Sequence, residues 1–259
     1  MRQSIFMLSE TEKVQVQSLK VKPDLNAKIW DRDDEYKIYP EVRRKLLDVA
    51  RYFAEFCELD ELGVNAHVTD IILTGSIANY NWSMYSDIDV HVVMDFSGVE
   101  DRARAILVQY LDLKKKQFAE QHDITVASHE VEMYVQDSSA ELVALGVYSL
   151  TDDKWLKFPK KYEEQIEWDL VKKKAASYMN AIDDAWKAVN FGSVKSPDAL
   201  MSGLTSLWKK IKSDRRAGLE ESGEFSVENL VFKVLRRNGY ISKLLDLRSR
   251  MVSQKLSLK

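Results

Sequence analysis

Apolar residues in the first part of the chain alternate between the spacings of strands and helices. Short apolar runs at 69–74 and 87–94 have the length and alternation of strands, and a third strand is predicted over 124–136. Spacings of three and four residues predict helices over 41–58 and 98–120. The order helix, strand, strand, helix, strand predicts an α+β fold with a small mixed β-sheet flanked by helices on one side.

After Leu150 the apolar spacing becomes almost entirely helical. Three segments carry this pattern, residues 163–190, 200–215 and 226–250. Each is too apolar on one face to stand alone in water, so we expect the helices to pack on each other and on the sheet. The chain is therefore predicted to hold a first domain over 1–155 and a C-terminal helical region over 156–259 packed on it.

The segments between these elements have weaker patterns. Residues 1–38 are polar and are expected to wrap the surface, and a short helix is expected after Ser76. Loops are expected at 192–197 and 218–223, where glycine and proline gather. Ser226 is expected to cap a helix, because its hydroxyl can accept a bond from the first turn.

Composition describes an ordinary soluble globular protein, with 45% hydrophobic and 31% charged residues. The formal net charge of −3 excludes a generic polyanion binder, so any nucleic-acid contact must use a local basic patch. We expect no membrane partner, since no apolar run approaches the roughly 20 residues of a span, and the N-terminus has no continuous apolar signal segment. The single cysteine, Cys57, excludes an internal disulfide and is expected in the core. The cytoplasm is the expected compartment.

Two carboxylates stand on the second predicted strand. Asp87 and Asp89 alternate with Ile88 and Val90, so both acids project from one face while the apolar pair is buried behind them. Two carboxylates a few Å apart repel each other by roughly 1–4 kcal/mol, depending on the local dielectric. A divalent cation relieves that repulsion, and oxygen-only ligands favour Mg²⁺ or Mn²⁺.

A Gly-Ser turn ends the first predicted strand. Gly75 can adopt backbone conformations closed to other residues and leaves room for a ligand. If a helix begins near Ser76, its free N–H groups suit a phosphate. A phosphate site beside a metal-binding carboxylate pair is typical of nucleotidyl or phosphoryl transfer.

These motifs resemble a known superfamily. The Gly-Ser turn followed by the Asp87-Ile88-Asp89 strand, over roughly residues 71–135, is similar to nucleotidyltransferases related to DNA polymerase β. A narrower resemblance, from Leu25 almost to the C-terminus, is to nucleotidyltransferases often encoded by bacteriophages, which implies a bacterial or phage-infected host cell. The shared phrases are LTGSIANYNW, YSDIDVHVV, HEVEMYVQD and ENLVFKVLRRNGY.

The resemblance implies a role for five residues. A third carboxylate is expected from the third strand, where Glu132 is favoured over Glu130 because its surroundings match the hydrophobic-acid-hydrophobic pattern better. Asp87 and Asp89 would hold two Mg²⁺ or Mn²⁺ ions, with Glu132 sharing the catalytic one. Gly75 and Ser76 would hold the β- and γ-phosphates of an NTP.

The resemblance also implies the reaction. An NTP, expected to be ATP, would bind between the sheet and the helical region and give its NMP, expected to be AMP, to an acceptor hydroxyl, with pyrophosphate released. The acceptor could be RNA or tRNA, a protein, a small molecule or a second nucleotide, and the oligomeric state is left open. A basic side chain from 209–216 or 236–237 is expected near the triphosphate. The alternative is a non-catalytic nucleotide- or RNA-binding module with the same fold.

Other residues near the motif keep two interpretations. His91 and His129 are candidates for a ligand role, although packed, hydrogen-bonded histidines are commoner. The aromatic loop at 79–85 could stack a base or cap the core. The lysine run at 114–116 is expected to be a solvated helix face.

Overall fold

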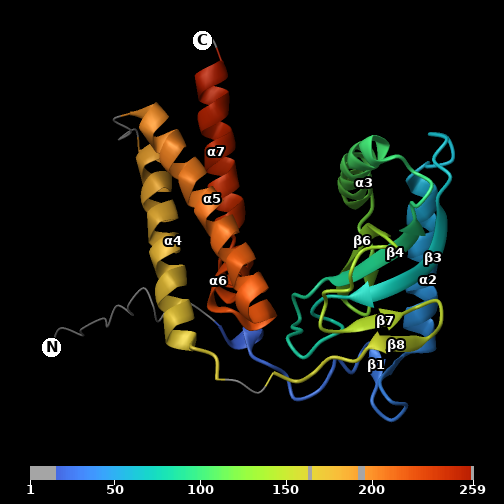
Figure 1. The fold of residues 1–259 in the computed structure, drawn as a ribbon. Helices are drawn as coiled ribbons and strands as arrows, with labels where there is room; N and C mark the ends of the chain where they lie inside the picture. Colours follow the sequence, from blue (N-terminus) through green and yellow to red (C-terminus); the bar gives the residue numbers. More distant parts are fainter. Residues whose placement is uncertain (1–15, 163–164, 192–195, 258–259) are drawn as a thin grey trace. The chain divides into compact units, whose positions relative to one another are not determined.

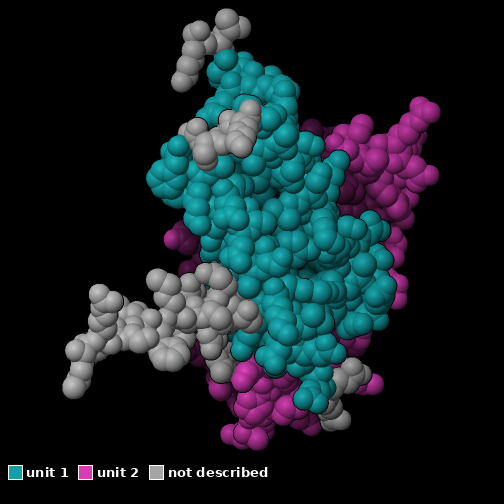
Figure 2. All heavy atoms as spheres, turned by 90° about the vertical axis from the view of Figure 1, so that its left-hand side faces the viewer, with its two compact units in different colours: residues 1–19, 163–259 teal, residues 20–162 magenta. Residues whose placement is uncertain are grey.

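The computed structural model describes residues 16–162, 165–191 and 196–257. The chain forms two compact units, one of residues 20–162 and the other of residues 1–19 together with 163–259 (Figure 2). We call the first the sheet unit and the second the helical unit. No described helix is both long enough and apolar enough to cross a membrane.

The sheet unit is built on a six-stranded sheet in the order β5-β6-β4-β3-β7-β8. Its strands are β3 (His67–Thr74), β4 (Ile88–Asp95), β5 (Thr125–Val126), β6 (His129–Asp137), β7 (Val147–Ser149) and β8 (Lys154–Lys157). The neighbouring strands β4 and β6 are parallel, and the other neighbours are antiparallel. A separate small hairpin joins β1 (Trp30–Asp31) to β2 (Lys37–Ile38). The sheet is therefore mixed, as the sequence predicts.

Two helices supply the apolar layer of this sheet, α2 (Pro40–Phe56) and α3 (Asp101–Gln121) (Figure 1). Pro40 opens α2 at a position where its missing N–H costs nothing. Leu46 and Phe53 of α2 share one core with Val90 and Val92 of β4. The thiol of Cys57 is buried there as expected, and burial raises its pKa to about 11.

Four long helices form the helical unit, α4 (Trp168–Asn190), α5 (Pro197–Ser222), α6 (Val227–Arg237) and α7 (Tyr240–Leu256) (Figure 1). Short 3₁₀-helices, η1 (Gln17–Leu19) and η2 (Gly223–Phe225), belong to the same unit. One apolar core contains residues from all four helices, among them Val171, Ile211, Leu235 and Leu244. Ser226 caps α6 as predicted, its hydroxyl accepting a bond from the Asn229 N–H at 3.3 Å.

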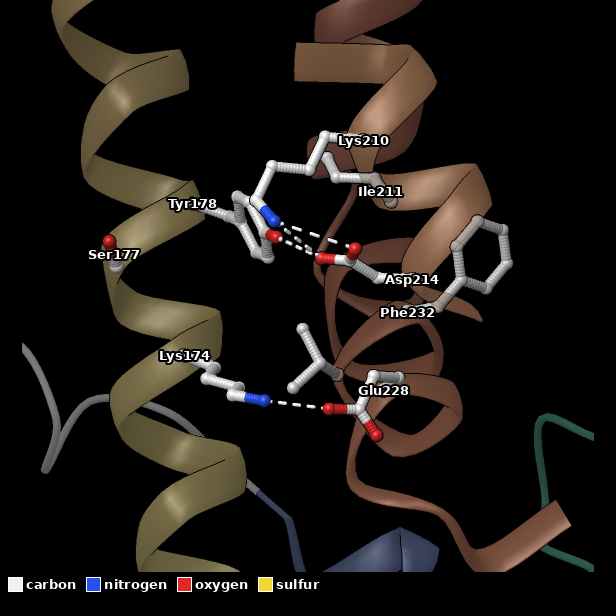
Figure 3. A pocket seen from close by; sticks show the side chains of 9 residues that line it. Lys174, Ser177, Tyr178, Lys210, Ile211, Asp214, Glu228 and Phe232 are labelled. Carbon is white, nitrogen blue, oxygen red and sulfur yellow. Dashed lines mark hydrogen bonds and ion pairs between the residues drawn. The ribbon is translucent and has the colours of Figure 1, made fainter. Parts of the chain in front are cut away.

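A cavity of about 300 Å³ opens between α4, α5 and α6 (Figure 3). Lys174 donates to Glu228 at 2.6 Å, which links α4 to α6. Asp214 of α5 accepts from Tyr178 at 2.9 Å and from Lys210 at 3.1 Å. Polar pairs therefore bridge these helices where apolar packing is incomplete.

The short helix predicted after Ser76 is not formed, and this segment makes turns instead. The Ile77 carbonyl accepts a bond from Trp30 Nε1 at 2.9 Å. The Ala78 carbonyl packs so closely on Gly146 that a Cβ added there would lie 1.8 Å from its oxygen. Both carbonyls contact distant parts of the chain, and these contacts accompany the turns found in this segment.

The third strand is also shorter than predicted. Residues 124–136 are divided into the hairpin of β5 and β6, with Val126 opposite His129. Ala127 and Ser128 form the turn with φ of 49° and 69°. Two-residue hairpin turns need such positive values, which usually signal Gly, Asn or Asp in a sequence. Neither residue gives that signal.

Three further predictions need correction. Of the segment 1–38, the described residues 16–38 do not simply wrap the surface, because Leu25, Ile29 and Trp30 are at most 2% exposed in the core. The loop predicted at 218–223 is helical as far as Ser222. Strands β7 and β8 were not predicted at all. The loop predicted at 192–197 falls mainly on 192–195, outside the described residues.

Candidate functional site

One face of the central strands carries a row of polar residues. Asp89 of β4 pairs with Thr74 of β3 on one side and with Glu132 of β6 on the other. Asp89 and Glu132 are half-exposed, whereas Ile88, Val90 and Met133 alternate with them and are buried. Paired residues in neighbouring strands project from the same face. The sheet therefore brings Asp89 and Glu132 side by side.

Asp87 lies immediately before β4, at the end of a tightly bonded loop. The Ser86 hydroxyl accepts bonds from the Ser76 hydroxyl at 2.8 Å and from the Ser83 N–H at 2.9 Å. The Ser86 carbonyl accepts a bond from His129 Nδ1 at 2.7 Å. These bonds tie the residue before Asp87 to the Gly-Ser turn and to the start of β6.

Gly75 is required by both its conformation and its surroundings. Its φ is +75°, in the left-handed region that favours glycine. A Cβ added at this position would lie 1.9 Å from Asp89 Oδ2. The space that the sequence suggested for a ligand is therefore taken up by the Asp89 carboxylate, and Gly75 makes room for that acid.

Glu132 has two close partners that sequence reasoning did not identify. The Tyr134 hydroxyl donates to Glu132 Oε2 at 2.6 Å, and Lys115 Nζ of α3 lies 3.3 Å from the same oxygen. Lys115 Nζ also lies 3.3 Å from the centre of the Tyr134 ring. Burial raises the pKa of Tyr134, and the charge of Asp89 and the bond to Glu132 raise it further. Tyr134 is therefore a neutral donor between two of the acids.

These contacts change the interpretation of the lysine run at 114–116. Lys115 is half-buried and paired with Glu132, and Lys114 is paired with Glu58. The expectation of a solvated helix face is wrong for these two residues. Lys116 is exposed as predicted.

Glu130, the other candidate for the third acid, is more exposed. It lies opposite Thr125 in the edge hairpin rather than beside Asp89. The alternation of β6 still places it on the same face as Glu132. The preference for Glu132 as the functional acid stays a prediction.

Both histidines are packed and hydrogen-bonded. His91 donates through Nδ1 to Gln136 at 2.8 Å and stacks on Tyr134, with ring centres 4.6 Å apart. Burial lowers the pKa of His91. His129 accepts a bond from Asn26 at its Nε2, 2.9 Å away, while its Nδ1 holds Ser86. Both side chains position their neighbours.

The aromatic loop is divided between the two expected roles. Tyr80 is buried, and Trp82 is half-buried with its Nε1 donating to the Asp24 carbonyl at 2.8 Å. These two rings cap the core. Tyr85 is 59% exposed, which leaves its ring as the candidate for contact with a base.

The acid residues fit a divalent cation by type and by face. Asp87, Asp89 and Glu132 offer only carboxylate oxygens, which suit Mg²⁺ or Mn²⁺. Within the described part of the chain, no three acidic, histidine or cysteine side chains are grouped closely enough to enclose an ion. The Glu132 carboxylate is instead engaged by Tyr134 and Lys115. Metal binding at all three acids would therefore place the ion in competition with the Lys115 ammonium for the Glu132 carboxylate.

The helical unit carries a cluster of cations on α5 and α6. Lys233 Nζ lies 3.8 Å from Glu224 Oε2. Burial lowers the pKa of Lys233, and the charges of Arg236, Arg215 and Arg237 lower it further. Sequence reasoning missed Lys233, although it lies between two of the basic segments it singled out. The expectation that one of those segments contacts a triphosphate stays a prediction.

Comparisons with known proteins show which family the chain belongs to. Two solved structures show weak similarity, the STING-associated CdnE c-di-GMP synthase from Capnocytophaga granulosa and CdnC in a complex with HORMA-deltaN from E. coli MS115-1. The first is 10% identical with a TM-score of 0.23, covering 84% of both chains. The second is 16% identical with a TM-score of 0.22, covering 86% of this chain and 69% of the other. Likeness at these scores carries no argument about function.

A comparison with curated proteins gives no match. A family model described as a nucleotidyltransferase domain, in contrast, matches residues 49–196, more than half of the chain. That range contains Gly75, Ser76, Asp87, Asp89 and Glu132, the residues that carried the resemblance. The chain belongs to the nucleotidyltransferase domain family.

Proposed function

We propose that this nucleotidyltransferase uses Mg²⁺ or Mn²⁺ to transfer AMP from ATP to an acceptor hydroxyl. The observation that carries the proposal is the pairing of Asp89 with Glu132 beside the Gly75 turn. A binding module has little use for carboxylates gathered near a phosphate, because they repel the ligand. A transferase needs them to bind cations. We assign the reaction to the first domain, residues 1–155.

Three carboxylates form the metal-binding part of the proposal. Asp87 and Asp89 would hold two ions, and Glu132 would share the catalytic one. When bound, these ions neutralise the triphosphate and lower the pKa of the attacking hydroxyl. The protein's part is to present Asp89 and Glu132 from neighbouring strands, with Asp87 just before β4, backed by a buried apolar layer.

The Gly-Ser turn forms the phosphate-binding part. The left-handed conformation of Gly75 turns the backbone sharply at the end of β3. Ser76 is half-exposed as a residue, and its hydroxyl donates to Ser86, the residue before Asp87. In this assignment the turn contacts the β- and γ-phosphates with the backbone and hydroxyl of these two residues, without the helix terminus that the sequence suggested.

The reaction is an in-line substitution at phosphorus. The acceptor oxygen forms a bond to the α-phosphorus, and the bond from that phosphorus to the α,β-bridging oxygen breaks. Pyrophosphate leaves with the bridging oxygen, and the hydroxyl proton passes to solvent. The fixed carboxylates contribute by orientation, since the reacting groups need not be brought together from solution.

The experiment incubates the full chain with α-³²P-labelled ATP, GTP, CTP or UTP, with Mg²⁺ or Mn²⁺, and with separate acceptor pools of RNA, protein and small metabolites. We expect label from ATP to enter one pool and to require the divalent cation. The Asp89→Asn variant serves as the inactive control. Metal-dependent ATP binding with no transfer into any pool would favour a binding module and contradict the proposal.

A further inference from the structure

A second hollow lies on the sheet unit, away from Asp87, Asp89 and Glu132. We call these three residues the acid row. The hollow is an open groove of about 870 Å³ between the first turns of α2 and the β5–β6 hairpin. Its floor is apolar and includes Tyr39, Val49 and Val126, all half-buried. We call it the α2 groove.

The rim of the α2 groove is basic. Lys28, Arg44 and Lys45 line it and are exposed, and Glu41 is the acid among its lining residues. Within the described part of the chain, no ion pair involves Lys28, Arg44 or Lys45. Lys28 Nζ donates to the Ser128 hydroxyl at 3.3 Å.

This unpaired charge is local and unlike its surroundings. The neighbouring Arg43 is paired with Asp153 at 3.3 Å and donates to the Leu150 carbonyl at 2.7 Å. The whole chain has a net charge of −3. Cations without ion-pair partners therefore gather at a hollow on a chain whose net charge is negative, which is the electrostatic pattern of a polyanion site.

The α2 groove is joined to the acid row through the hairpin. Ser128 lines the groove, and the next residue, His129, donates to the carbonyl of Ser86 at 2.7 Å. Ser86 directly precedes Asp87. Because β4 and β6 are parallel, the groove lies at the end of the sheet where Asp87 and Asp89 also lie. A flexible chain held in the groove can reach round the sheet edge to the acids.

We propose that the α2 groove binds the sugar-phosphate backbone of a single-stranded nucleic acid that serves as the acceptor. This inference rests on the proposed function and names its acceptor class. Phosphates contact Arg44, Lys45 and Lys28 along the rim, and unpaired bases rest on the apolar floor around Tyr39. A duplex cannot use that floor, because its bases are stacked and paired. A flat bilayer cannot enter a concave groove.

The test measures binding of fluorescein-labelled single-stranded RNA and DNA of about 12 nucleotides to the full chain by fluorescence anisotropy. The variant is Arg44→Glu with Lys45→Glu, two exposed positions without ion-pair partners. The matched control, Lys116→Glu with Lys173→Glu, makes the same change of net charge at exposed positions outside the groove. Binding of a non-hydrolysable ATP analogue is measured for all three proteins.

We expect the groove variant to bind the strand at least about tenfold more weakly and the control to change less than about twofold. Two lost phosphate contacts also make the slope of log K against log salt about 1.4 units less steep. ATP-analogue binding is expected to be unchanged. Comparing RNA with DNA tells which backbone the groove prefers, and poly-glutamate is expected to compete poorly.

Equal weakening in the control, or equal competition by poly-glutamate, would overturn the groove and leave only general electrostatic binding. Failure of any strand to bind would also overturn it. Label transfer from ATP to a protein or small molecule under the same conditions would show that the proposed function stands and only the acceptor class is wrong. Absence of transfer to every acceptor pool would count against the function itself.

Discussion

The carboxylate of Asp89 occupies the space that a side chain on Gly75 would need, with Oδ2 only 1.9 Å from the position of an added Cβ. The two residues are joined through the pairing of Thr74 with Asp89 across β3 and β4. The glycine of the turn and the acid of the strand thus form one unit. A side chain cannot be added at Gly75 without moving the Asp89 carboxylate.

Gly75→Ala is therefore expected to displace the Asp89 carboxylate. The left-handed backbone conformation adds a cost of about 1–2 kcal/mol to the free energy of folding. We expect Mn²⁺ affinity, measured by calorimetry, and label transfer from ATP both to fall. The control is Gly98→Ala, because a Cβ there meets no atom within 4 Å and its φ is not positive. Unchanged Mn²⁺ affinity in Gly75→Ala would contradict this coupling.

Asp89→Asn tests the carboxylate without changing its size. We expect transfer to fall at least about a hundredfold, or about 2.7 kcal/mol of transition-state stabilisation. The melting temperature is expected to stay equal or rise, because removing one charge relieves repulsion with Asp87. Thermal unfolding followed by circular dichroism measures the melting temperature. An active variant, or one that fails to fold, would defeat the assignment.

Period-two alternation was enough to predict the acid face. Asp87, Asp89 and Glu132 were placed on one side because apolar residues alternate with them. The burial patterns of β4 and β6 show that alternation around Asp89 and Glu132, whereas Asp87 lies just before β4. Tyr134 could have been found by the same rule, since it lies two residues after Glu132. Lys115 could not, because its contact depends on how α3 packs against β6. That packing is tertiary information.

Two of the errors in the fold have identifiable causes. The hairpin turn at Ala127 and Ser128 uses residues that rarely adopt positive φ, so the pattern predicted one continuous strand. The helix after Ser76 was predicted from a local motif. In the structure the carbonyls of this segment contact Trp30 and Gly146, which are far away in the sequence. Distant contacts override the local motif in the segment after Ser76.

Glu132→Gln and Glu130→Gln separate the two candidates for the third acid. Glu132 lies opposite Asp89, whereas Glu130 lies opposite Thr125 at the sheet edge. We expect loss of transfer in Glu132→Gln and only a modest reduction in Glu130→Gln. Single-turnover label transfer at saturating Mg²⁺ measures both. The opposite ranking would mean that the wrong acid was chosen.

The cavity of the helical unit offers a test of pH dependence (Figure 3). The bond from Lys174 lowers the pKa of Glu228 below its ordinary value of 4.5. A carboxyl with a depressed pKa stabilises the fold above its unfolded pKa, and that stability is lost as pH falls through the folded value. Because both side chains are partly exposed, the pair contributes only about 0.5 kcal/mol.

Lys174→Met should therefore lower the free energy of unfolding at pH 7, and the difference from the wild type should shrink as pH falls below about 4.5. Urea unfolding of the full chain at several pH values measures the difference. Lys173→Met is the control, since Lys173 is exposed and outside the cavity. A difference that stays constant with pH would show that Lys174 contributes only through packing.

Replacing Tyr134 and replacing Lys115 are expected to change the metal affinity of the acid row in opposite directions. The Tyr134 hydroxyl donates to Glu132 at 2.6 Å and fixes the orientation of that carboxylate. Loss of such a supporting bond typically costs 10- to 100-fold in metal affinity. Tyr134→Phe keeps the ring stacked on His91, so we expect Mn²⁺ affinity to fall by about tenfold with little change in melting temperature.

Lys115→Met removes a positive charge 3.3 Å from Glu132 Oε2. An ammonium there competes with a bound cation, so its removal should strengthen Mn²⁺ binding a few-fold. Tyr110→Phe is the control for the tyrosine, because its hydroxyl donates to the Cys57 carbonyl at 2.8 Å, away from the acids. Calorimetric titration with Mn²⁺ measures all three variants without relying on catalysis. If Tyr134→Phe and Tyr110→Phe changed Mn²⁺ affinity equally, or if Lys115→Met weakened it, Glu132 would not be a metal ligand held by these partners.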